Sequence, residues 1–280
     1  MAKTRQKTGA LPGMGLSREG EGRVALITGA SAGLGLAFAE EFARHGFGLV
    51  LTARRAGRLA AAAADLSARF GVRTLVVPED LADPAAPARI FAAIEAAGLV
   101  VDALVNNAGY GLTGQFEDQG WPAHRDFLEV LIGAPTALAH LALPGMRARR
   151  FGRILNIASL AGFLPATLGA TLYSPAKSYL LIFSQSLALE TRGTGIHVTA
   201  LCPGLTHTEF HDTDDLRPDI ARMPPWIWME APAVARQGYD AVMRGRPLLV
   251  NGAHNALFAL LLRALPLWAL RPLIRRVMSP

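Results

Sequence analysis

The chain has 280 residues, of which 51% are hydrophobic, and 28 Lys and Arg against 22 Asp and Glu give it a net charge of +6. The single cysteine, Cys202, excludes an internal disulfide, and we expect it to be a small buried side chain on a strand. No aromatic-rich basic module accompanies the positive charge, which argues against nucleic-acid binding. No apolar stretch follows the basic N-terminus, which argues against a signal peptide.

Strand and helix signals alternate after an expected flexible extension at residues 1–21. Strands are predicted at Val24–Thr28, Leu49–Thr52, Thr74–Val77, Val101–Val105, Arg153–Ala158, Ile196–Leu201 and Leu248–Val250. Helices are predicted at Leu34–His45, Arg58–Phe70, Ala85–Ala97, about Ala123 to Arg149, Pro175–Arg192 and Pro232–Arg244. Apolar strands that alternate with helices are typical of parallel β-α-β units with right-handed crossovers. The sequence therefore predicts an α/β fold: a single doubly wound Rossmann-type domain over residues 22–252, with a central parallel sheet flanked by helices. An apolar and basic helical tail is expected at 253–280.

A glycine-rich loop, TGASAGLG, joins the first strand to the first helix. Its glycines let the backbone turn tightly and approach a pyrophosphate, and the helix N-terminus faces the phosphate with free N–H groups and a positive dipole end. A merely tight turn is the alternative, but the position between a first strand and a first helix favours a dinucleotide site. The predicted cofactor contacts here are Thr28, Gly29, Ser31, Gly33, Leu34 and Gly35.

Two arginines, Arg54 and Arg55, follow the second strand. NAD-binding folds usually place an acidic residue here for the ribose hydroxyls, whereas an arginine suits a 2′-phosphate. Arg54 therefore predicts NADP(H) as the cofactor rather than NAD(H). A solvated arginine pair at a helix start is the alternative.

Tyr173 and Lys177 are four residues apart in a helical stretch, so both side chains lie on one helix face. The lysine ammonium can stabilise a phenolate there. Bringing the tyrosine pKa from about 10 to about 7 needs roughly 4 kcal/mol, and one cation in a partly dry site can supply much of it. Taken alone, such a pair is more often two ordinary surface or core residues.

Seen with the other motifs, the chain resembles the short-chain dehydrogenase/reductase family over roughly residues 22–252. Its glycine loop looks like the family's TGxxxGxG, NNAG follows the fourth strand at Asn106–Gly109, and Tyr173 and Lys177 match YxxxK. Ser159, in ILNIASLAG, matches the catalytic serine. Asp80, in EDLAD, is similar to the aspartate that the family places near the adenine. The segment that begins at Pro203-Gly204 resembles the one that contacts the nicotinamide amide.

The resemblance implies a role for each matched residue. Tyr173 is the general acid that protonates a carbonyl oxygen, or the base in the reverse direction. Ser159 hydrogen-bonds the same oxygen, and Lys177 lowers the tyrosine pKa and binds the nicotinamide ribose. Two donors aimed at that oxygen would stabilise the alkoxide that hydride transfer develops. The further cofactor contacts implied are Asp80, Leu81, Asn107, Ala108, Gly109, Tyr173, Lys177, Pro203, Gly204, Thr206 and Thr208.

One position departs from the family pattern. Many members carry an asparagine in the long helix after NNAG, where it helps to hold a water that links the lysine to solvent. The alignment places Leu131 there, and a leucine side chain neither donates nor accepts a hydrogen bond. Pro135 should also kink this helix near Leu131. Proton resupply would then be slower or use another group, while nucleotide binding should survive.

The connection at 203–230 holds the residues expected to face the substrate. Large apolar side chains on a lid over the nicotinamide would exclude water and favour an apolar substrate. The alternative is that the tryptophans simply fasten the loop to the core. The apolar residues are Phe210, Met223, Trp226, Trp228 and Met229, and the acidic residues Asp212, Asp214, Asp215 and Asp219 are expected to form a solvated face.

The tail, Ala256–Met278, is rich in leucine but too interrupted by arginine and proline for a spanning helix, which needs about 20 mostly apolar residues. Two short helices packed on the substrate region or on a subunit interface are one possibility. The other is an interfacial helix on an anionic membrane. The histidines show no metal-ligand spacing, and no metal is expected.

The sequence thus predicts an NADP(H)-dependent oxidoreductase that acts on an apolar ketone or secondary alcohol, lipid-like, steroid or aromatic. The alternative is an NADP(H)-binding sensor or scaffold with weak or no turnover because of Leu131. The family resemblance implies a homodimer or homotetramer. A cytoplasmic location is expected, with possible membrane contact through the tail.

Overall fold

The computed structural model describes residues 19–112, 114–165, 171–209 and 223–264. Most of the predicted N-terminal extension lies outside the described residues. So do Phe210, the four aspartates at 212–219, and the tail beyond Ala264.

Seven parallel strands form the central sheet, in the order β3-β2-β1-β4-β5-β6-β9. The strands are β1 (Val24–Thr28), β2 (Gly48–Thr52), β3 (Thr74–Val76), β4 (Ala103–Asn106), β5 (Gly152–Ile157), β6 (Ile196–Cys202) and β9 (Leu248–Val250). The chain builds outward from β1 to β3 and then returns to the other side of β1 with β4. The predicted doubly wound sheet is confirmed, and its strand order reverses between β1 and β4, where ligands of such sheets bind beyond the carboxyl ends of the strands.

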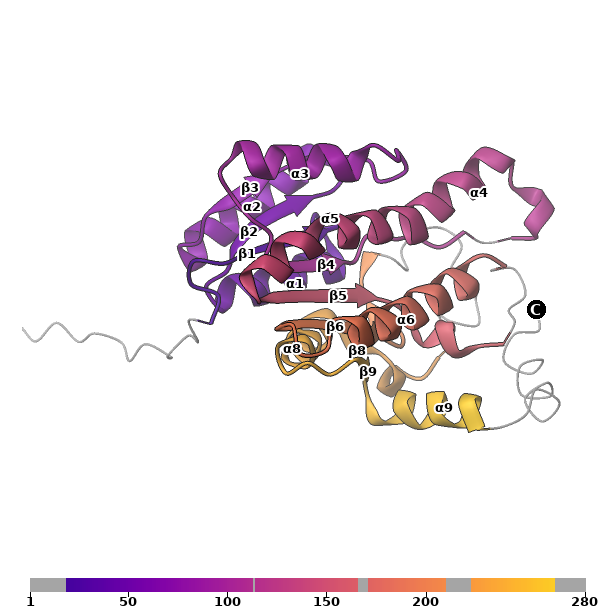
Figure 1. Ribbon diagram of the computed structural model, residues 1–280. Helices are drawn as coiled ribbons and strands as arrows, with labels where there is room; N and C mark the ends of the chain where they lie inside the picture. Colours follow the sequence, from indigo (N-terminus) through magenta and orange to yellow (C-terminus); the bar gives the residue numbers. More distant parts are fainter. Residues whose placement is uncertain (1–18, 113, 166–170, 210–222, 265–280) are drawn as a thin grey trace, which may run out of the picture.

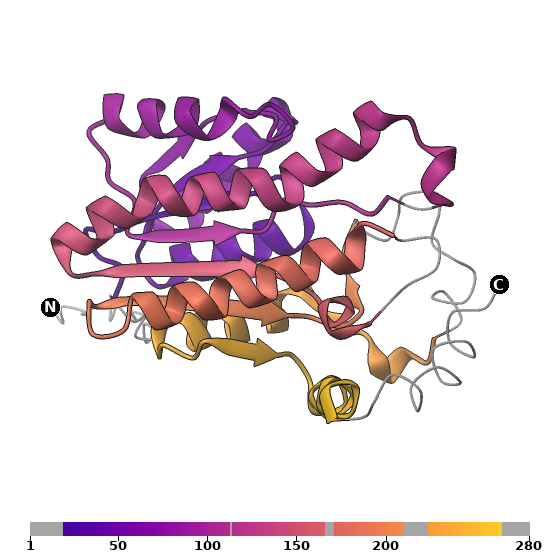
Figure 2. The same cartoon turned by 45° about the vertical axis from the view of Figure 1, so that its right-hand side comes forward.

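Helices cover both faces of the sheet (Figures 1 and 2). One layer holds α3 (Ala86–Ala96), α5 (Ala134–Arg149) and α6 (Tyr173–Glu190), and the other holds α1 (Gly33–Arg44), α2 (Ala56–Phe70) and α8 (Ala231–Met243). Successive strand residues supply the two cores: Leu26 packs in the first and Ile27 in the second, and both are fully buried. Strands buried on both faces explain why β1 reads as the unbroken apolar run VALIT.

The long predicted helix is interrupted just before Pro135. It consists of α4 (Trp121–Leu128), a π-helical turn at Glu129–Gly133, and α5, whose first turn contains Pro135. Proline has no N–H to donate to the preceding turn, so the helix rearranges there. The predicted kink near Leu131 is therefore confirmed, and it takes the form of a π-helical turn, a feature often found at functional sites.

By length and composition, the helical stretch Trp121–Arg149 could cross a membrane, with a mean hydropathy of 1.5. Much of this hydropathy belongs to the core, because Phe127, Leu138 and Met146 are fully buried against the sheet. A buried core helix passes the same test as a membrane-spanning one.

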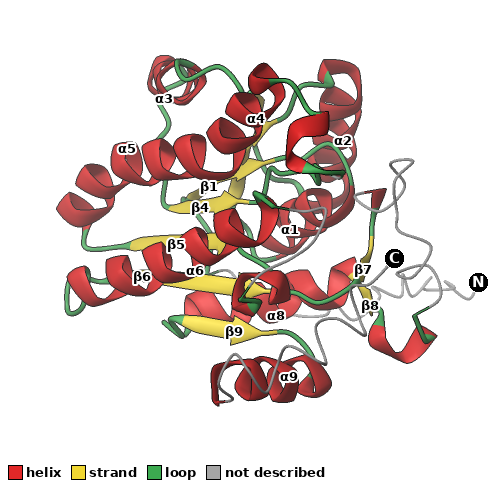
Figure 3. Cartoon of the chain, turned by 90° about the vertical axis from the view of Figure 1, so that its right-hand side faces the viewer, coloured by secondary structure: helices red, strands yellow, loops and turns green. Residues whose placement is uncertain are grey.

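Two further features lie near the carboxyl end of the sheet, of which the first was not predicted and the second is the start of the expected helical tail. Within the 203–230 connection, β7 (Thr206–His207) pairs in parallel with β8 (Met229–Glu230) and forms a separate two-stranded sheet. The tail begins with a single helix, α9 (Ala253–Ala264), which lies next to β9 at the edge of the sheet opposite β3 (Figure 3). Both elements lie close to the site described next.

Candidate active site

The glycine-rich loop leads directly from β1 into α1. Gly29 and Gly33 have positive φ values of 67° and 54°, a conformation that other residues rarely adopt. A Cβ atom on Gly35 would lie 2.2 Å from the carbonyl oxygen of Gly29 and 2.6 Å from Nδ2 of Asn107. This backbone cradle at the N-terminus of α1 fits the pyrophosphate of a dinucleotide, because it leaves the helix N–H groups open to an anion.

Hydrogen bonds join the carboxyl ends of β1 and β4. The Oγ1 atom of Thr28 accepts hydrogen bonds from the backbone N–H groups of Asn107 and Ala108, each at 2.9 Å. The side-chain amide of Asn107 donates in return to the backbone oxygen of Thr28, also at 2.9 Å. The predicted residues Thr28, Asn107 and Ala108 therefore act together, as a clasp that holds the NNAG segment beside the glycine loop.

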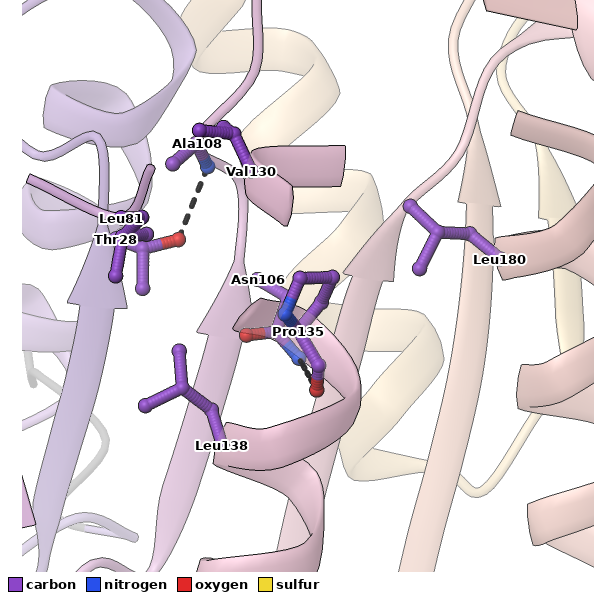
Figure 4. A pocket seen from close by; sticks show the side chains of 8 residues that line it. All are labelled: Thr28, Leu81, Asn106, Ala108, Val130, Pro135, Leu138 and Leu180. Carbon is purple, nitrogen blue, oxygen red and sulfur yellow. Dashed lines mark hydrogen bonds between the residues drawn. The ribbon is translucent and has the colours of Figure 1, made fainter. Parts of the chain in front are cut away.

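A small cavity lies behind this clasp, and Figure 4 shows its lining. Asn106 donates from Nδ2 to the backbone oxygen of Pro135 at 3.3 Å and to Oδ1 of Asn156 at 2.8 Å. Asn156 donates in turn to Ser184, so a buried polar chain runs from β4 through β5 to α6. The cavity is lined by Thr28, Leu81, Asn106, Ala108, Val130, Pro135, Leu138 and Leu180. None of the three predicted catalytic side chains is among them, so this cavity is not the place of reaction.

Asp80 and Arg54 lie at the outer end of the predicted nucleotide site. The carboxylate of Asp80 accepts a hydrogen bond from the backbone N–H of Ala82 at 3.0 Å, which fixes the turn after β3. Arg54 is exposed at the end of β2, just before α2. Burial raises the pKa of Tyr110, the charge of Asp126 raises it further, and the positive charge of Arg54 lowers it. An exposed arginine in this position is available to a phosphate.

The structure brings Ser159, Tyr173 and Lys177 together. Ser159 follows β5, and its side chain accepts a hydrogen bond from the backbone N–H of Ala161 at 3.1 Å. Tyr173 begins α6 and is hydrogen-bonded to the side chain of Ser159. Lys177 lies one turn further along α6, buried, with its Nζ 5.7 Å from the centre of the Tyr173 ring. The helical spacing predicted for this pair is therefore present.

Burial shifts the pKa values of both Tyr173 and Lys177. Burial raises the pKa of Tyr173 to about 12, and the hydrogen bond with Ser159 opposes this shift. Burial lowers the pKa of Lys177 to about 8, and its Nζ donates to the backbone oxygen of Ile157 at 2.8 Å. Lys177 is not among the causes that shift the pKa of Tyr173 here, and its ammonium is directed toward a carbonyl, so the expected lowering of the tyrosine pKa by Lys177 stays a prediction.

The segment that begins at Pro203 lies next to Ser159 and to the glycine loop. The backbone oxygen of Pro203 accepts a hydrogen bond from the N–H of Leu160 at 2.8 Å, next to Ser159. Thr206 donates to the backbone oxygen of Gly204 at 3.1 Å. A Cβ atom on Gly33 would lie 3.2 Å from Cβ of Thr208, so the end of this segment lies against the glycine loop. The chain regions predicted from separate motifs therefore border one site.

Leu131 lies where the departure from the family pattern matters most. Its side chain is buried, in the π-helical turn. A Cβ atom on Gly109 would lie 3.8 Å from Leu131 and also 3.8 Å from Nζ of Lys177. Leu131 and the lysine ammonium thus both border Gly109, and an apolar side chain stands where the family pattern has a hydrogen-bonding amide.

Two parts of the site were missed by sequence reasoning. Asn255, on α9, packs against the Pro203 segment, since a Cβ atom on Gly204 would lie 2.4 Å from its Nδ2 atom. Arg55 and Arg58 form ion pairs with Glu209. No local pattern marks these contacts, because each joins residues that are far apart in the chain.

Cys202 is buried in β6, as expected, and burial raises its pKa to about 12. Among the described residues, no group of three or more His, Cys, Asp or Glu side chains could hold a metal ion.

Comparisons with known proteins show the family of this chain. The sequence model of the short chain dehydrogenase family matches residues 23–218. Oxidoreductase UcpA of Escherichia coli strain K12 is 37% identical over 188 residues, which cover 67% of this chain and 70% of that protein. A very-long-chain 3-oxoacyl-CoA reductase of Coprinopsis cinerea is 36% identical over 198 residues, 69% of this chain, but the match spans only 58% of that protein.

Among solved structures, a short-chain dehydrogenase from Sphingobium yanoikuyae in complex with NADPH superposes with a TM-score of 0.75. It is 32% identical in sequence, and the match covers 92% of this chain and 95% of that one. The family match at residues 23–218 therefore includes six of the seven strands of the central sheet, the glycine loop, and Ser159, Tyr173 and Lys177, while β9 lies beyond it. This chain belongs to the short-chain dehydrogenase family of oxidoreductases.

Proposed function

We propose that the protein is an NADP(H)-dependent oxidoreductase that transfers a hydride between the nicotinamide and an apolar ketone or secondary alcohol. The observation that carries the proposal is the hydrogen-bonded pair Ser159 and Tyr173, with Lys177 one turn away, beside a glycine loop that fits a dinucleotide. Arg54 favours NADP(H) over NAD(H). The Sphingobium yanoikuyae neighbour was solved with NADPH, which supports the same choice.

The side chains of the site supply the proton chemistry. When bound, NADPH provides the hydride, and the protein provides position and electrostatics. Tyr173 donates its proton to the carbonyl oxygen as negative charge develops there, and the hydroxyl of Ser159 hydrogen-bonds the same atom. The ammonium of Lys177 stabilises the phenolate that remains. The backbone oxygen of Ile157 fixes the lysine so that it stays beside the tyrosine.

An apolar substrate is supported by the described part of the 203–230 connection. Trp226 is 68% exposed, and its ring meets that of His254 at a centroid distance of 5.6 Å. Trp228 stacks on His207 at 4.8 Å, a contact within the connection itself, so the alternative that the tryptophans fasten the loop to the core is not decided by it. Trp226 presents a large apolar surface next to α9, the helix whose Asn255 packs against Gly204. The reductase of Coprinopsis cinerea, by its name, acts on a very-long-chain acyl substrate.

A substrate panel tests this proposal. Purified protein with NADPH should reduce bulky apolar ketones with a kcat/KM at least about tenfold above that for polar sugars of similar size, since desolvating unpaired hydroxyl groups costs about 1.4 kcal/mol or more. NADPH absorbance gives the rate, and chromatography of the alcohol confirms the product. Sugars as the best substrates would contradict the apolar assignment.

A second candidate is favoured by one observation, the apolar Leu131 that borders Gly109 together with Lys177. In this reading, the protein binds NADP(H) as a sensor or scaffold and turns over weakly. The same panel separates the two. Tight NADPH binding without reduction of any ketone, together with turnover in Leu131→Asn, would favour the sensor and locate the defect at this residue.

We also propose a homo-oligomer in which the outer faces of α5 and α6 meet their copies. The two helices are adjacent, since Thr136 and Tyr179 are hydrogen-bonded at 2.9 Å between them. They expose Leu141, Ile182 and Leu189, and apolar side chains of this kind favour burial between subunits. Light scattering on the purified protein would show a dimer or tetramer, and a monomer would refute the proposal.

The cytoplasm is the proposed location, with peripheral contact between the C-terminal region and an anionic membrane. α9 exposes Leu257, Leu260 and Leu261, and Arg263 lies in its last turn. An apolar face joined to basic residues suits an interfacial helix. Leu260→Glu should reduce co-sedimentation with anionic vesicles, whereas Leu189→Glu on α6 should not. Equal binding of both variants and the wild type would contradict the contact through α9.

A further inference from the structure

A carboxylate from a distant segment lies among the arginines at the start of α2. The Oε2 atom of Glu209 is 3.1 Å from Nη2 of Arg55, and Oε1 is 3.0 Å from Nη1 of Arg58. Arg55 also donates to the hydroxyl of Ser31, in the glycine loop, at 3.3 Å. Two arginines, a loop hydroxyl and a carboxylate therefore form one exposed cluster beside the predicted phosphate site.

The position of Glu209 is set by the segment that precedes it. Thr206 and His207 form β7, which is held by pairing with β8. The next residue, Thr208, lies against the glycine loop, and a Cβ atom on Gly33 would be 3.9 Å from the backbone nitrogen of Glu209. The carboxylate is thus brought to the arginines by neighbours that border the cofactor site.

The two arginines that bind the Glu209 carboxylate could bind a phosphate in its place. Arginine presents N–H donors in a planar fork that binds carboxylate and phosphate in the same way. The hydrogen bond from Arg55 is the main reason why the pKa of the Glu209 carboxyl is lowered, so the group is negative at neutral pH. A carboxylate and a phosphate cannot both use the same donors, and their charges repel each other.

We propose that Glu209 competes with the 2′-phosphate of NADP(H) for Arg55 and Arg58, and so limits the preference of the protein for NADP(H) over NAD(H). The inference rests on the proposed binding of NADP(H) with its 2′-phosphate at the arginines that follow β2. Glu209 is then a specificity-determining residue of the cofactor site, and the two arginines are phosphate ligands in addition to Arg54. NAD(H) has no 2′-phosphate, so Glu209 leaves its affinity unaffected.

The test is a pair of binding titrations, of NADPH and of NADH, followed by nucleotide fluorescence. Glu209→Gln keeps the size of the side chain and removes its charge. Because an exposed ion pair contributes about 0.2–1 kcal/mol and two such pairs are lost, the Kd for NADPH should fall by about 2- to 30-fold. The Kd for NADH should stay as in the wild type. In a background of Arg55→Gln and Arg58→Gln, Glu209→Gln should have no effect on NADPH.

Asp65→Asn is the matched control. Asp65 also pairs with an arginine on α2, since its Oδ2 is 2.9 Å from Nη1 of Arg69, and the pair is similarly exposed. It lies about 10 Å further along the helix than Arg58, at ~1.5 Å per residue, so removing its charge should change neither Kd. An equal gain in NADPH affinity in this control would assign the effect to overall charge and overturn the proposal.

The remaining outcomes separate the inference from the proposed function. Unchanged or weaker NADPH binding by Glu209→Gln, in a protein whose wild type prefers NADPH, overturns the competition and leaves the proposed cofactor intact. A wild type that binds NADPH no more tightly than NADH, with no gain in NADPH affinity in Glu209→Gln, overturns both. A gain for NADPH alone, lost in the double arginine background, is the expected result.

Discussion

Replacing Tyr173 by phenylalanine is expected to lower kcat for carbonyl reduction by about 10²- to 10⁴-fold, the usual contribution of a positioned general acid. The variant keeps the ring that packs in the core and removes only the hydroxyl that is hydrogen-bonded to Ser159. The carbonyl oxygen then loses its proton donor, and Ser159 alone faces the developing charge. Steady-state NADPH oxidation with the best ketone of the panel measures the effect.

Binding should survive this change. Loss of one hydrogen bond is worth about 0.5–1.5 kcal/mol, so the Kd for NADPH should rise by at most about tenfold. The matched control is Tyr179→Phe, which removes a hydroxyl from the same helix, where it meets Thr136 at 2.9 Å. The control should keep the wild-type kcat. A Tyr173→Phe variant as active as the control would refute the role of Tyr173 as proton donor.

Gly35→Ala is expected to weaken NADPH binding by about 10- to 100-fold, since overpacking of a tight site costs about 1–3 kcal/mol. The added Cβ would lie 2.2 Å from the backbone oxygen of Gly29, so the glycine loop has to move away from the pyrophosphate position. Asn107 would be displaced with it, because its Nδ2 is 2.6 Å from the same Cβ position. The free energy of unfolding should fall with the nucleotide affinity.

The control for this substitution is Gly57→Ala in α2. Gly57, in the first turn of α2, has open space around its Cβ position, so an alanine there causes no clash. This variant should bind NADPH as the wild type does and unfold at the same or a higher temperature. Fluorescence titration and thermal unfolding measure both properties. Wild-type NADPH affinity in Gly35→Ala would show that the loop is not the pyrophosphate cradle.

The sheet and the catalytic set could be predicted because their signals are local. An apolar run such as Val24–Thr28 has no other favourable place than a strand buried on both faces. The spacing of Tyr173 and Lys177 needs only a helix to bring them together. The glycine loop is readable for the same reason, since its positive φ values demand glycine.

Other features depend on contacts between distant residues and could not be predicted. Glu209 lies 154 residues from Arg55 in the chain, and nothing near either residue indicates that they meet. Asn255 packs on Gly204 because the fold places the start of α9 next to that residue, and no local sequence pattern indicates this position. The pKa shift of Tyr173 could not be predicted from the sequence either. The spacing places a cation nearby, but it does not indicate that Tyr173 is buried or that the Lys177 ammonium donates to Ile157.

The most direct test of the central claim follows the hydride itself. NADPH deuterated at both positions of nicotinamide C4 is incubated with the protein and an apolar ketone, and the alcohol is analysed by mass spectrometry. We predict one deuterium on the carbinol carbon, formed in equal amount with NADP⁺, and at least about 10²-fold less labelled alcohol with Tyr173→Phe in the same time. Tight binding of NADPH without transfer of deuterium to any ketone or sugar would contradict an oxidoreductase built on Ser159, Tyr173 and Lys177.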